Sequence, residues 1–235
     1  FRMKKFYSFF FLILLHLTFF FICGNIDIYT VKTKNKGPKI LLIGGTHGNE
    51  PAGYVTLLRL QNAFKKKKLT LRAGELTIIH NINSCGYFIG NRHYNNIGPR
   101  IDLNRFYNKN FFINKKVENI VDKYDIILDF HEGWGYINSK ENNSIGSSIQ
   151  TINIPKYQYD ELLKIINNKI HIDYKKWSLN TRAIIDNTLR DYCLRKNKKY
   201  MLIETSGQNN VQNINVRINQ SLEIINYILK KYKLL

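Results

Sequence analysis

A short apolar run that ends in glycines constrains the fold of this chain more than any other feature. Residues 40–43 read Ile-Leu-Leu-Ile, and residues 44–50 continue Gly-Gly-Thr-His-Gly-Asn-Glu. The apolar run is typical of a buried strand, and the glycines allow a tight turn at its end. Open α/β sheets bind ligands at the carboxyl edge of their strands, so we expect His47 and Glu50 to lie there as two metal ligands. With 6 histidines in 235 residues, chance also produces such pairs, so this interpretation depends on the rest of the chain.

Strand-like and helix-like segments alternate after this motif. A long polar loop, rich in Asn, Gly and Arg, lies between residues 81 and 110, and loops of that length in compact domains are usually functional or disordered. The alternation predicts an α/β fold with three α/β/α layers and a mixed, mostly parallel central sheet. Strands are expected at 26–31, 39–43, 75–80, 125–130 and 199–203, and helices at 51–65, 157–170, 186–194 and 216–234.

A third candidate metal ligand follows a later strand. His131 comes directly after the segment 125–130 and, with His47 and Glu50, completes a set of two histidines and one carboxylate. Catalytic zinc sites use about three such ligands and leave one position for water. The alternative for His131 is a histidine that caps the strand end by hydrogen bonding. Glu132 should point to the opposite side of the strand, either as a carboxylate behind the ligands or on the surface.

Glu204 is the candidate proton carrier. It follows the apolar segment 199–203, so we expect it at the same edge of the sheet. Metal binding lowers the pKa of water from 15.7 to about 7, and a nearby carboxylate can take the released proton and pass it to a leaving amine. The alternative is a structural glutamate held by a salt bridge.

Arginines gather in the long polar loop. It contains Arg92, Arg100 and the run Asp102-Leu-Asn104-Arg105. Arginine can bind a carboxylate through two parallel hydrogen bonds and can stabilise a developing oxyanion, and an Asn amide adds a donor. In an isolated loop these residues would be solvated. Beside a zinc site they are candidates for holding the substrate.

The motifs, in this order, resemble those of a known family. The Gly-Gly-Thr-His-Gly-Asn-Glu run, Asp-Leu-Asn-Arg, Asp-Phe-His and Ile-Glu follow one another as they do in M14-type zinc carboxypeptidases. The first run is most similar to the succinylglutamate desuccinylase/aspartoacylase branch, and the resemblance covers roughly residues 38–207. It implies a zinc carboxypeptidase-like fold that binds one zinc ion per chain. It also implies His47, Glu50 and His131 as the zinc ligands and Glu204 as the general base and acid.

The resemblance further implies how the substrate is held. Asn104 and Arg105 would bind a substrate carboxylate. The family also has an arginine that polarises the scissile carbonyl, before the Asp-Leu-Asn-Arg run. Arg92 matches its usual setting, after Gly-Asn, but with a longer spacer than usual, and Arg100 is the competing candidate.

The predicted function is zinc-dependent hydrolysis of an amide bond in N-acyl amino acids or short peptides that bear a carboxylate. The expected partner is therefore a small anionic substrate. Two departures from the desuccinylase/aspartoacylase branch favour an alternative, an exported zinc carboxypeptidase or murein-peptide amidase. The chain ends after a single helix, where those enzymes carry a β-rich domain that narrows the cleft. Those enzymes are also generally cytoplasmic, whereas this chain carries a targeting segment.

The targeting segment occupies residues 1–24, and the catalytic domain is expected over 25–235. Lys4 and Lys5 precede an apolar run to about Ile22. The run is slightly short for a hydrocarbon core of about 30 Å, which favours a secretory signal over an anchor. An anchor that attaches the protein to a membrane through residues 4–23 stays open as the alternative. Either way the domain is expected to be exported or membrane-anchored.

The net charge of +19 comes from 36 Lys and Arg against 17 Asp and Glu. Such an excess attracts anions, but the chain is also rich in Asn and Ile, a mixture that AT-rich coding produces by itself. Nucleic-acid binding is not predicted, because the chain has no repeats, no zinc-finger spacing and no single-strand-binding signature. A non-enzymatic, membrane-attached anion-binding protein is the rival hypothesis.

The cysteines of the expected catalytic domain are Cys85 and Cys193. They could pair in an oxidising compartment or remain free buried thiols.

Overall fold

The computed structural model describes residues 25–94, 99–141 and 143–235. In this part of the chain a seven-stranded sheet has the order β1-β3-β2-β4-β7-β5-β6. Strands β2, β3, β4 and β7 run parallel to one another. Strand β1 is antiparallel to β3 and β5 is antiparallel to β7, whereas β6 runs parallel to β5. The strands are β1 (Tyr29–Lys32), β2 (Lys39–Ile43), β3 (Glu75–Ile79), β4 (Ile126–Gly133), β5 (Ser148–Ile152), β6 (Ser178–Leu179) and β7 (Lys199–Ser206). The predicted α/β class with a mixed, mostly parallel sheet is confirmed.

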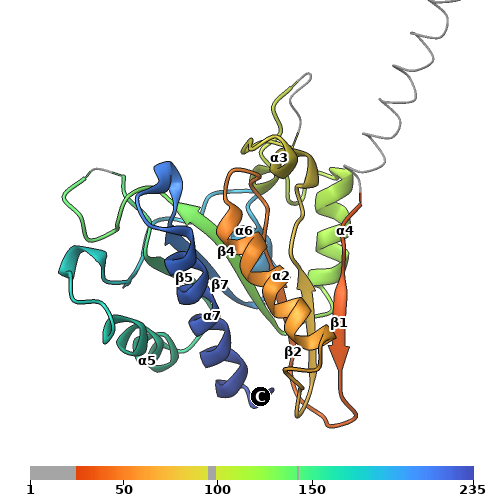
Figure 1. Ribbon diagram of the computed structural model, residues 1–235. Helices are drawn as coiled ribbons and strands as arrows, with labels where there is room; N and C mark the ends of the chain where they lie inside the picture. The colour runs from red at the N-terminus through yellow and green to blue at the C-terminus, as the bar shows by residue number, and fades with distance from the viewer. Residues whose placement is uncertain (1–24, 95–98, 142) are drawn as a thin grey trace, which may run out of the picture.

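Helices cover both faces of the sheet, which gives three layers (Figure 1). Residues on one face of β2, such as Ile40 and Leu42, pack in a core with α2, α5 and α7. Their neighbours Leu41 and Ile43 point to the other face and pack with α3, α4 and α6. The α-helices are α2 (Pro51–Lys65), α3 (Ser84–Phe88), α4 (Phe112–Val121), α5 (Lys156–Asn167), α6 (Leu189–Arg195) and α7 (Ile214–Lys231). The 3₁₀ helices span Leu103–Arg105, Asp173–Lys175 and Gln208–Asn210.

A close backbone approach explains why the motif after β2 needs glycine at position 48. A Cβ atom at Gly48 would lie 1.9 Å from the carbonyl carbon of Gly86, so the loop 44–50 packs directly on α3. The loop then enters α2 at Pro51, the first residue of the helix. Proline is favoured there because the first helical residues have no intrahelical partner for their N–H groups. The motif therefore fixes its two candidate ligands between a strand end and a helix start.

The structure contains elements that the sequence did not predict. The loop expected over 81–110 holds α3 and the 3₁₀ turn Leu103–Arg105, and α4, β5 and β6 were not expected at all. The predicted helix 51–65 agrees with α2, and β4 extends through Gly133, beyond the predicted 125–130. The strand predicted at 26–31 occupies Tyr29–Lys32 instead.

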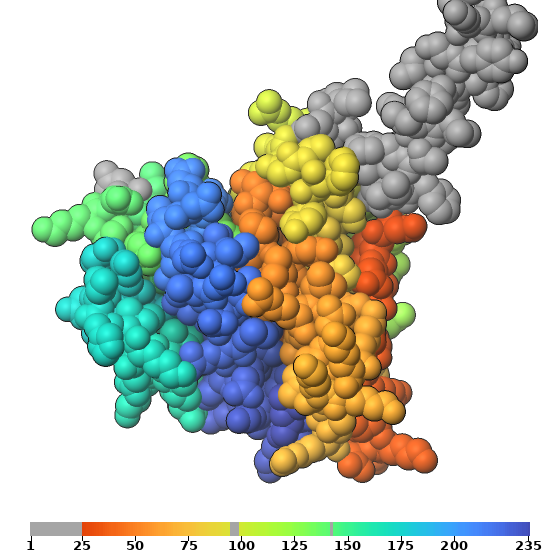
Figure 2. All heavy atoms as spheres, in the orientation of Figure 1, coloured from red at the N-terminus to blue at the C-terminus, as the bar shows by residue number. Residues whose placement is uncertain are grey.

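The predicted N-terminal segment, residues 1–24, lies outside the described residues. Within the described chain, no helix is both long and apolar enough to span a bilayer. Cys193 is a free, buried cysteine in α6, which excludes the possible pairing of Cys85 with Cys193. Figure 2 shows the surface of the molecule in the same orientation as Figure 1.

Candidate active site

Three neighbouring parallel strands bring the predicted residues to one edge of the sheet. β4 lies between β2 and β7, and all three run in the same direction. His131 is paired in register with Glu204 on the adjacent strand. Because residues in register on parallel strands point to the same face, both side chains reach the same side of the carboxyl edge. The loop after β2 delivers His47 and Glu50 beside them.

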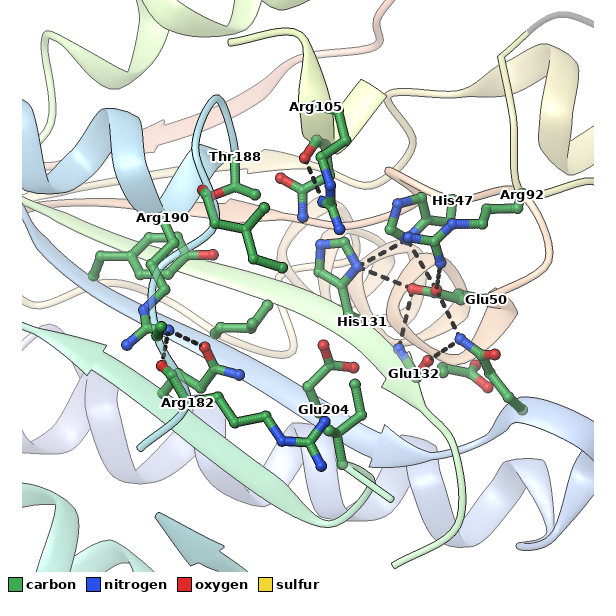
Figure 3. A pocket seen from close by; sticks show the side chains of 18 residues that line it. His47, Glu50, Arg92, Arg105, His131, Glu132, Arg182, Thr188, Arg190 and Glu204 are labelled. Carbon is green, nitrogen blue, oxygen red and sulfur yellow. Dashed lines mark hydrogen bonds and ion pairs between the residues drawn. The ribbon is translucent and has the colours of Figure 1, made fainter. Parts of the chain in front are cut away.

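His47, Glu50 and His131 form a buried cluster. One potential ligand atom from each lies within 4.8 Å of the others. Nδ1 of His131 is 3.1 Å from Nδ1 of His47 and 3.0 Å from Oε2 of Glu50. Nδ1 of His47 is 2.8 Å from Oε1 of Glu50. Two imidazole nitrogens and a carboxylate therefore converge on one point (Figure 3).

The opposite ring nitrogens face carboxylates. Nε2 of His47 is 3.0 Å from Oδ1 of Asp102, and Nε2 of His131 is 3.2 Å from Oδ1 of Asp129. Asp129 is fully buried and accepts a 2.8 Å hydrogen bond from the hydroxyl of Tyr200. Metal-binding histidines usually place a carboxylate at the nitrogen that does not bind the metal, which fixes the tautomer and the ring orientation. The donor set and its surroundings thus fit a zinc ion.

Charges within the cluster change the ionisation of its members. Burial alone would raise the pKa of Glu50, but the imidazoles of His47 and His131 hold it well below its usual range. Burial would also lower the pKa of His131, yet the carboxylates of Asp129 and Glu50 raise it well above its ordinary value. The raised pKa of His131 lets its ring carry positive charge that balances the buried carboxylates of Asp129 and Glu50. A divalent cation at the point of convergence would take over that role.

Other groups fix the orientation of Glu50. The backbone N–H of Glu132 donates to its Oε2 at 3.1 Å, and Nη1 of Arg92 donates to its Oε1 at 3.2 Å. The amide of Gln208 donates to the same Oε1 at 3.3 Å. Arg92 also donates to Oδ2 of Asp102 through Nε and Nη2, at 3.2 and 3.0 Å. Arg92 therefore joins Glu50 to the carboxylate that supports His47.

Glu132 is buried, which corrects the alternative that placed it on the surface. Its side chain forms an ion pair with the buried guanidinium of Arg217 in α7. Its other oxygen accepts a 2.5 Å hydrogen bond from the backbone N–H of Ala52 in the first turn of α2. Gly207 lies against this carboxylate so closely that a Cβ atom there would overlap it. Glu132 thus joins α2, α7 and the end of β7 directly behind the cluster.

Glu204 lines the pocket in front of the cluster and is 7 % exposed. Its burial raises its pKa to about 8; the charge of His131 opposes this rise, and the carboxylates of Glu50 and Asp129 add to it. A carboxyl group that titrates near neutral pH can both accept and donate a proton during turnover. Among the described residues no salt bridge involves Glu204, so the structural alternative for this residue has no support.

The pocket encloses about 180 Å³ and contains most of the predicted site residues. Arg92, Asn104 and Arg105 line it together with the cluster and Glu204. The Asn104 side-chain oxygen accepts a hydrogen bond from the N–H of Leu189, which leaves its NH₂ group to donate into the pocket. Arg100 is exposed and is not among the lining residues, so the structure does not bring it to the other site residues.

Sequence reasoning missed the other wall of the pocket. Arg190 and Arg182 lie there, opposite Arg92 and Glu50 (Figure 3). Arg190 donates to the side-chain oxygen of Gln150 and, at 3.1 Å, to the carbonyl of Arg182, while its buried Nε has no partner in the described chain. The sequence signal for this wall was the presence of arginines, Arg182 and Arg190 among them, between the predicted strands 125–130 and 199–203.

Residues 36–138 match the family model of the succinylglutamate desuccinylase/aspartoacylase catalytic domain. Among curated protein sequences, none matches the chain significantly. Similar solved structures include apo cell shape determinant protein Csd4 from Helicobacter pylori, with 17 % identity over 90 % of this chain and a TM-score of 0.73. A succinylglutamate desuccinylase from Silicibacter sp. TM1040 has 17 % identity over 89 % of this chain and a TM-score of 0.64.

An aspartoacylase family protein from Mesorhizobium loti is also similar, with 19 % identity over 89 % of this chain and a TM-score of 0.60. The matched regions make up 55 %, 61 % and 62 % of these three solved chains, so this chain spans little more than half their length. The resemblance to the M14-type superfamily, drawn from the motifs, is confirmed by the family match and by the shared fold.

Proposed function

We propose that this chain, as a member of the M14-like superfamily, is a zinc-dependent hydrolase. It cleaves an amide bond in a small substrate that bears carboxylates, an N-acyl amino acid or a short peptide. The observation that carries the proposal is the convergence of His47, Glu50 and His131, with Glu204 facing the same pocket. When bound there, zinc supplies Lewis-acid activation of water and of the scissile carbonyl.

The chain's own residues would move the proton and bind the developing charge. Glu204 accepts a proton from the attacking water and passes it to the leaving nitrogen, and its raised pKa suits both steps near neutral pH. Arg92 stands beside the cluster, one-third exposed, and presents its guanidinium toward the pocket where the oxyanion develops. We assign the carbonyl-polarising role to Arg92 because Arg100 lies outside the pocket lining.

The substrate's carboxylates would be held on two sides. Arg105 and the amide of Asn104 lie on one wall of the pocket, and Arg190 with Arg182 on the other. A guanidinium whose buried Nε lacks a partner, as in Arg190, can donate a charge-assisted hydrogen bond to an anionic ligand. Two cationic walls favour a substrate with two carboxylates, one on each side of the scissile bond.

Replacement of Arg105 with methionine tests this assignment. Loss of a charge-assisted hydrogen bond costs about 1.5–3 kcal/mol, so kcat/KM should fall by about 10–150-fold, mainly through KM. The measurement compares N-acetylaspartate, N-succinylglutamate and a muropeptide-like peptide, each with its carboxamide analogue. Arg59→Met, on the exposed side of α2, is the matched control and should have no effect. An equal loss for carboxylate and carboxamide substrates would contradict the carboxylate-binding role.

A second candidate is a carboxypeptidase that acts on short peptides. The mDAP-bound form of Helicobacter pylori Csd4, a D,L-carboxypeptidase, shares this fold with 18 % identity over 88 % of this chain and a TM-score of 0.71. The same substrate comparison separates the two, because a carboxypeptidase cleaves the peptide and leaves both N-acyl amino acids intact.

A further inference from the structure

The positive charge of the folded domain is concentrated at one end of the molecule, far from the candidate active site. We define a basic pole by the segments at the edge where the parallel strands begin. These segments carry 18 Lys and Arg against 5 Asp and Glu, whereas the rest of the described chain carries 15 against 12. The segments are 32–39, 65–75, 122–125, 153–161, 195–199 and 230–235.

Backbone and side-chain hydrogen bonds join these segments into one surface. The N–H of Asp125 donates to the carbonyl of Lys39, and the N–H of Lys199 donates to the carbonyl of Asp125. The N–H of Arg72 donates to the carbonyl of Leu234. Figures 1 and 2 show the C-terminal end of α7 beside the loop that follows α2, at the opposite end from α3. An AT-rich coding bias explains many lysines but not their gathering at one end.

The basic pole contains a groove of about 750 Å³. Five lysines line it with Tyr232, and Asp125 is its only acidic lining residue among the described residues. Lys198 donates to the carbonyls of Asp122 and Tyr124, both at 2.8 Å, so its ammonium group is held in place. Lys196 and Lys233 are exposed at the groove, and Lys66 and Lys68 extend the charge along the loop after α2. The groove is open, and its charged lining residues are lysines apart from Asp125.

We propose that the groove of the basic pole binds a linear polymer of phosphate groups, recognised by its charges alone. The ammonium group of lysine is a compact point charge with three donors, and it suits phosphate oxygens. A reader of bases would need free aromatic faces for stacking. Here Lys199 lies over the ring of Tyr232 and Lys231 lies over that of Tyr157, so an ammonium group already covers a face of each ring. A concave groove with half-buried lysines also fits a chain better than a flat bilayer.

Inorganic polyphosphate binding to the full chain tests the proposal. Each phosphate contact contributes about 5–8-fold to the binding constant at about 0.1 M salt through counterion release. The double variant Lys196→Glu/Lys233→Glu should therefore bind polyphosphate at least tenfold more weakly, with a shallower salt dependence. Lys109→Glu/Lys164→Glu is the matched control, since it makes the same change in net charge at exposed sites outside the pole. It should lose less than about threefold. Hydrolytic activity should be unchanged in both, so the outcome is independent of the proposed function.

Several results would overturn the proposal. An equal loss in both double variants would show that only net charge matters. A wild-type chain that does not bind polyphosphate at about 0.05 M salt would exclude the site. Tighter binding to vesicles with anionic lipid than to polyphosphate would identify the surface as a membrane contact. Binding to oligonucleotides that depends on their base sequence would identify a nucleic-acid reader.

Discussion

Replacement of Glu204 with glutamine should lower kcat by about 10²–10⁴-fold and leave KM and zinc content nearly unchanged. General acid–base catalysis contributes a factor of this size, and glutamine cannot carry the proton. The side chain keeps its shape, so the pocket and the buried cluster stay intact. Glu204 stands in register with His131, yet it is not one of the three converging ligands. Zinc content and turnover should therefore separate in this variant.

Steady-state kinetics and metal analysis of the same preparation check this prediction. Glu223→Gln, in α7 and away from the pocket, is the matched control and should be fully active. If Glu204→Gln retained wild-type turnover, the residue would not carry the proton. That result would favour the rival hypothesis of a non-enzymatic anion-binding protein, which predicts that the substitution leaves function intact.

Replacement of Arg217 with methionine should destabilise the fold by about 3–5 kcal/mol, because it leaves the carboxylate of Glu132 buried without its partner. For a chain of this length such a loss lowers Tm by about 10 °C. Glu132 also accepts from the N–H of Ala52, two residues after Glu50. Without Arg217 the Glu132 carboxylate is no longer held in place, so the segment that carries Glu50 should be less well ordered. Zinc affinity should therefore fall by about 10–100-fold, as it does when other residues that support metal ligands are replaced.

Thermal unfolding and zinc titration measure the two effects. The double variant Glu132→Gln/Arg217→Met removes both charges but keeps an oxygen that accepts from Ala52. Replacing both members of a buried ion pair is often close to neutral, so this variant should recover most of the stability and the zinc affinity. If the double variant were as unstable as Arg217→Met, the cost would come from packing of the arginine and not from its charge.

The sequence predicted the part of the site that follows strands. In β2, β4 and β7 an apolar run precedes ionisable groups, which lie in the loop after β2 and in the last residues of β4 and β7, and parallel strands place these positions at one edge. His47, Glu50, His131 and Glu204 could therefore be placed together without knowledge of any contact between them. The helix after Glu50 was also predictable, because a proline marks its first residue.

Polar residues occupy part of the buried face in two of the elements that were missed, α4 and β5. In α4, Asn114 and Glu118 are buried beside Ile113 and Val117. Asn114 donates to the carbonyl of Leu103, and Glu118 accepts from the N–H of Asn108, so both are satisfied by the loop that carries the arginines. Strand β5 contains Ser148 and Gln150 at buried positions. Hydrophobic periodicity therefore marks β5 only weakly, whereas α4 does carry Ile113, Val117 and Val121 at helical spacing and was missed despite that pattern.

The second arginine wall was missed for a different reason. Arg182 and Arg190 lie in and after an irregular segment, and their place in the pocket depends on how β5 and α6 meet the end of β7. No local pattern marks such a tertiary contact. The buried pair of Glu132 and Arg217 joins residues 85 positions apart and is equally invisible in the sequence.

Zinc analysis of the purified full chain tests the central claim most directly. The account predicts one zinc ion per chain, removed by a chelator together with activity, and restored with activity when zinc is returned. His131→Ala should abolish stoichiometric zinc, whereas His171→Ala, outside the pocket, should not change it. A chain that hydrolyses its substrates without bound metal, or that keeps its zinc in His131→Ala, would contradict the assignment of the metal centre.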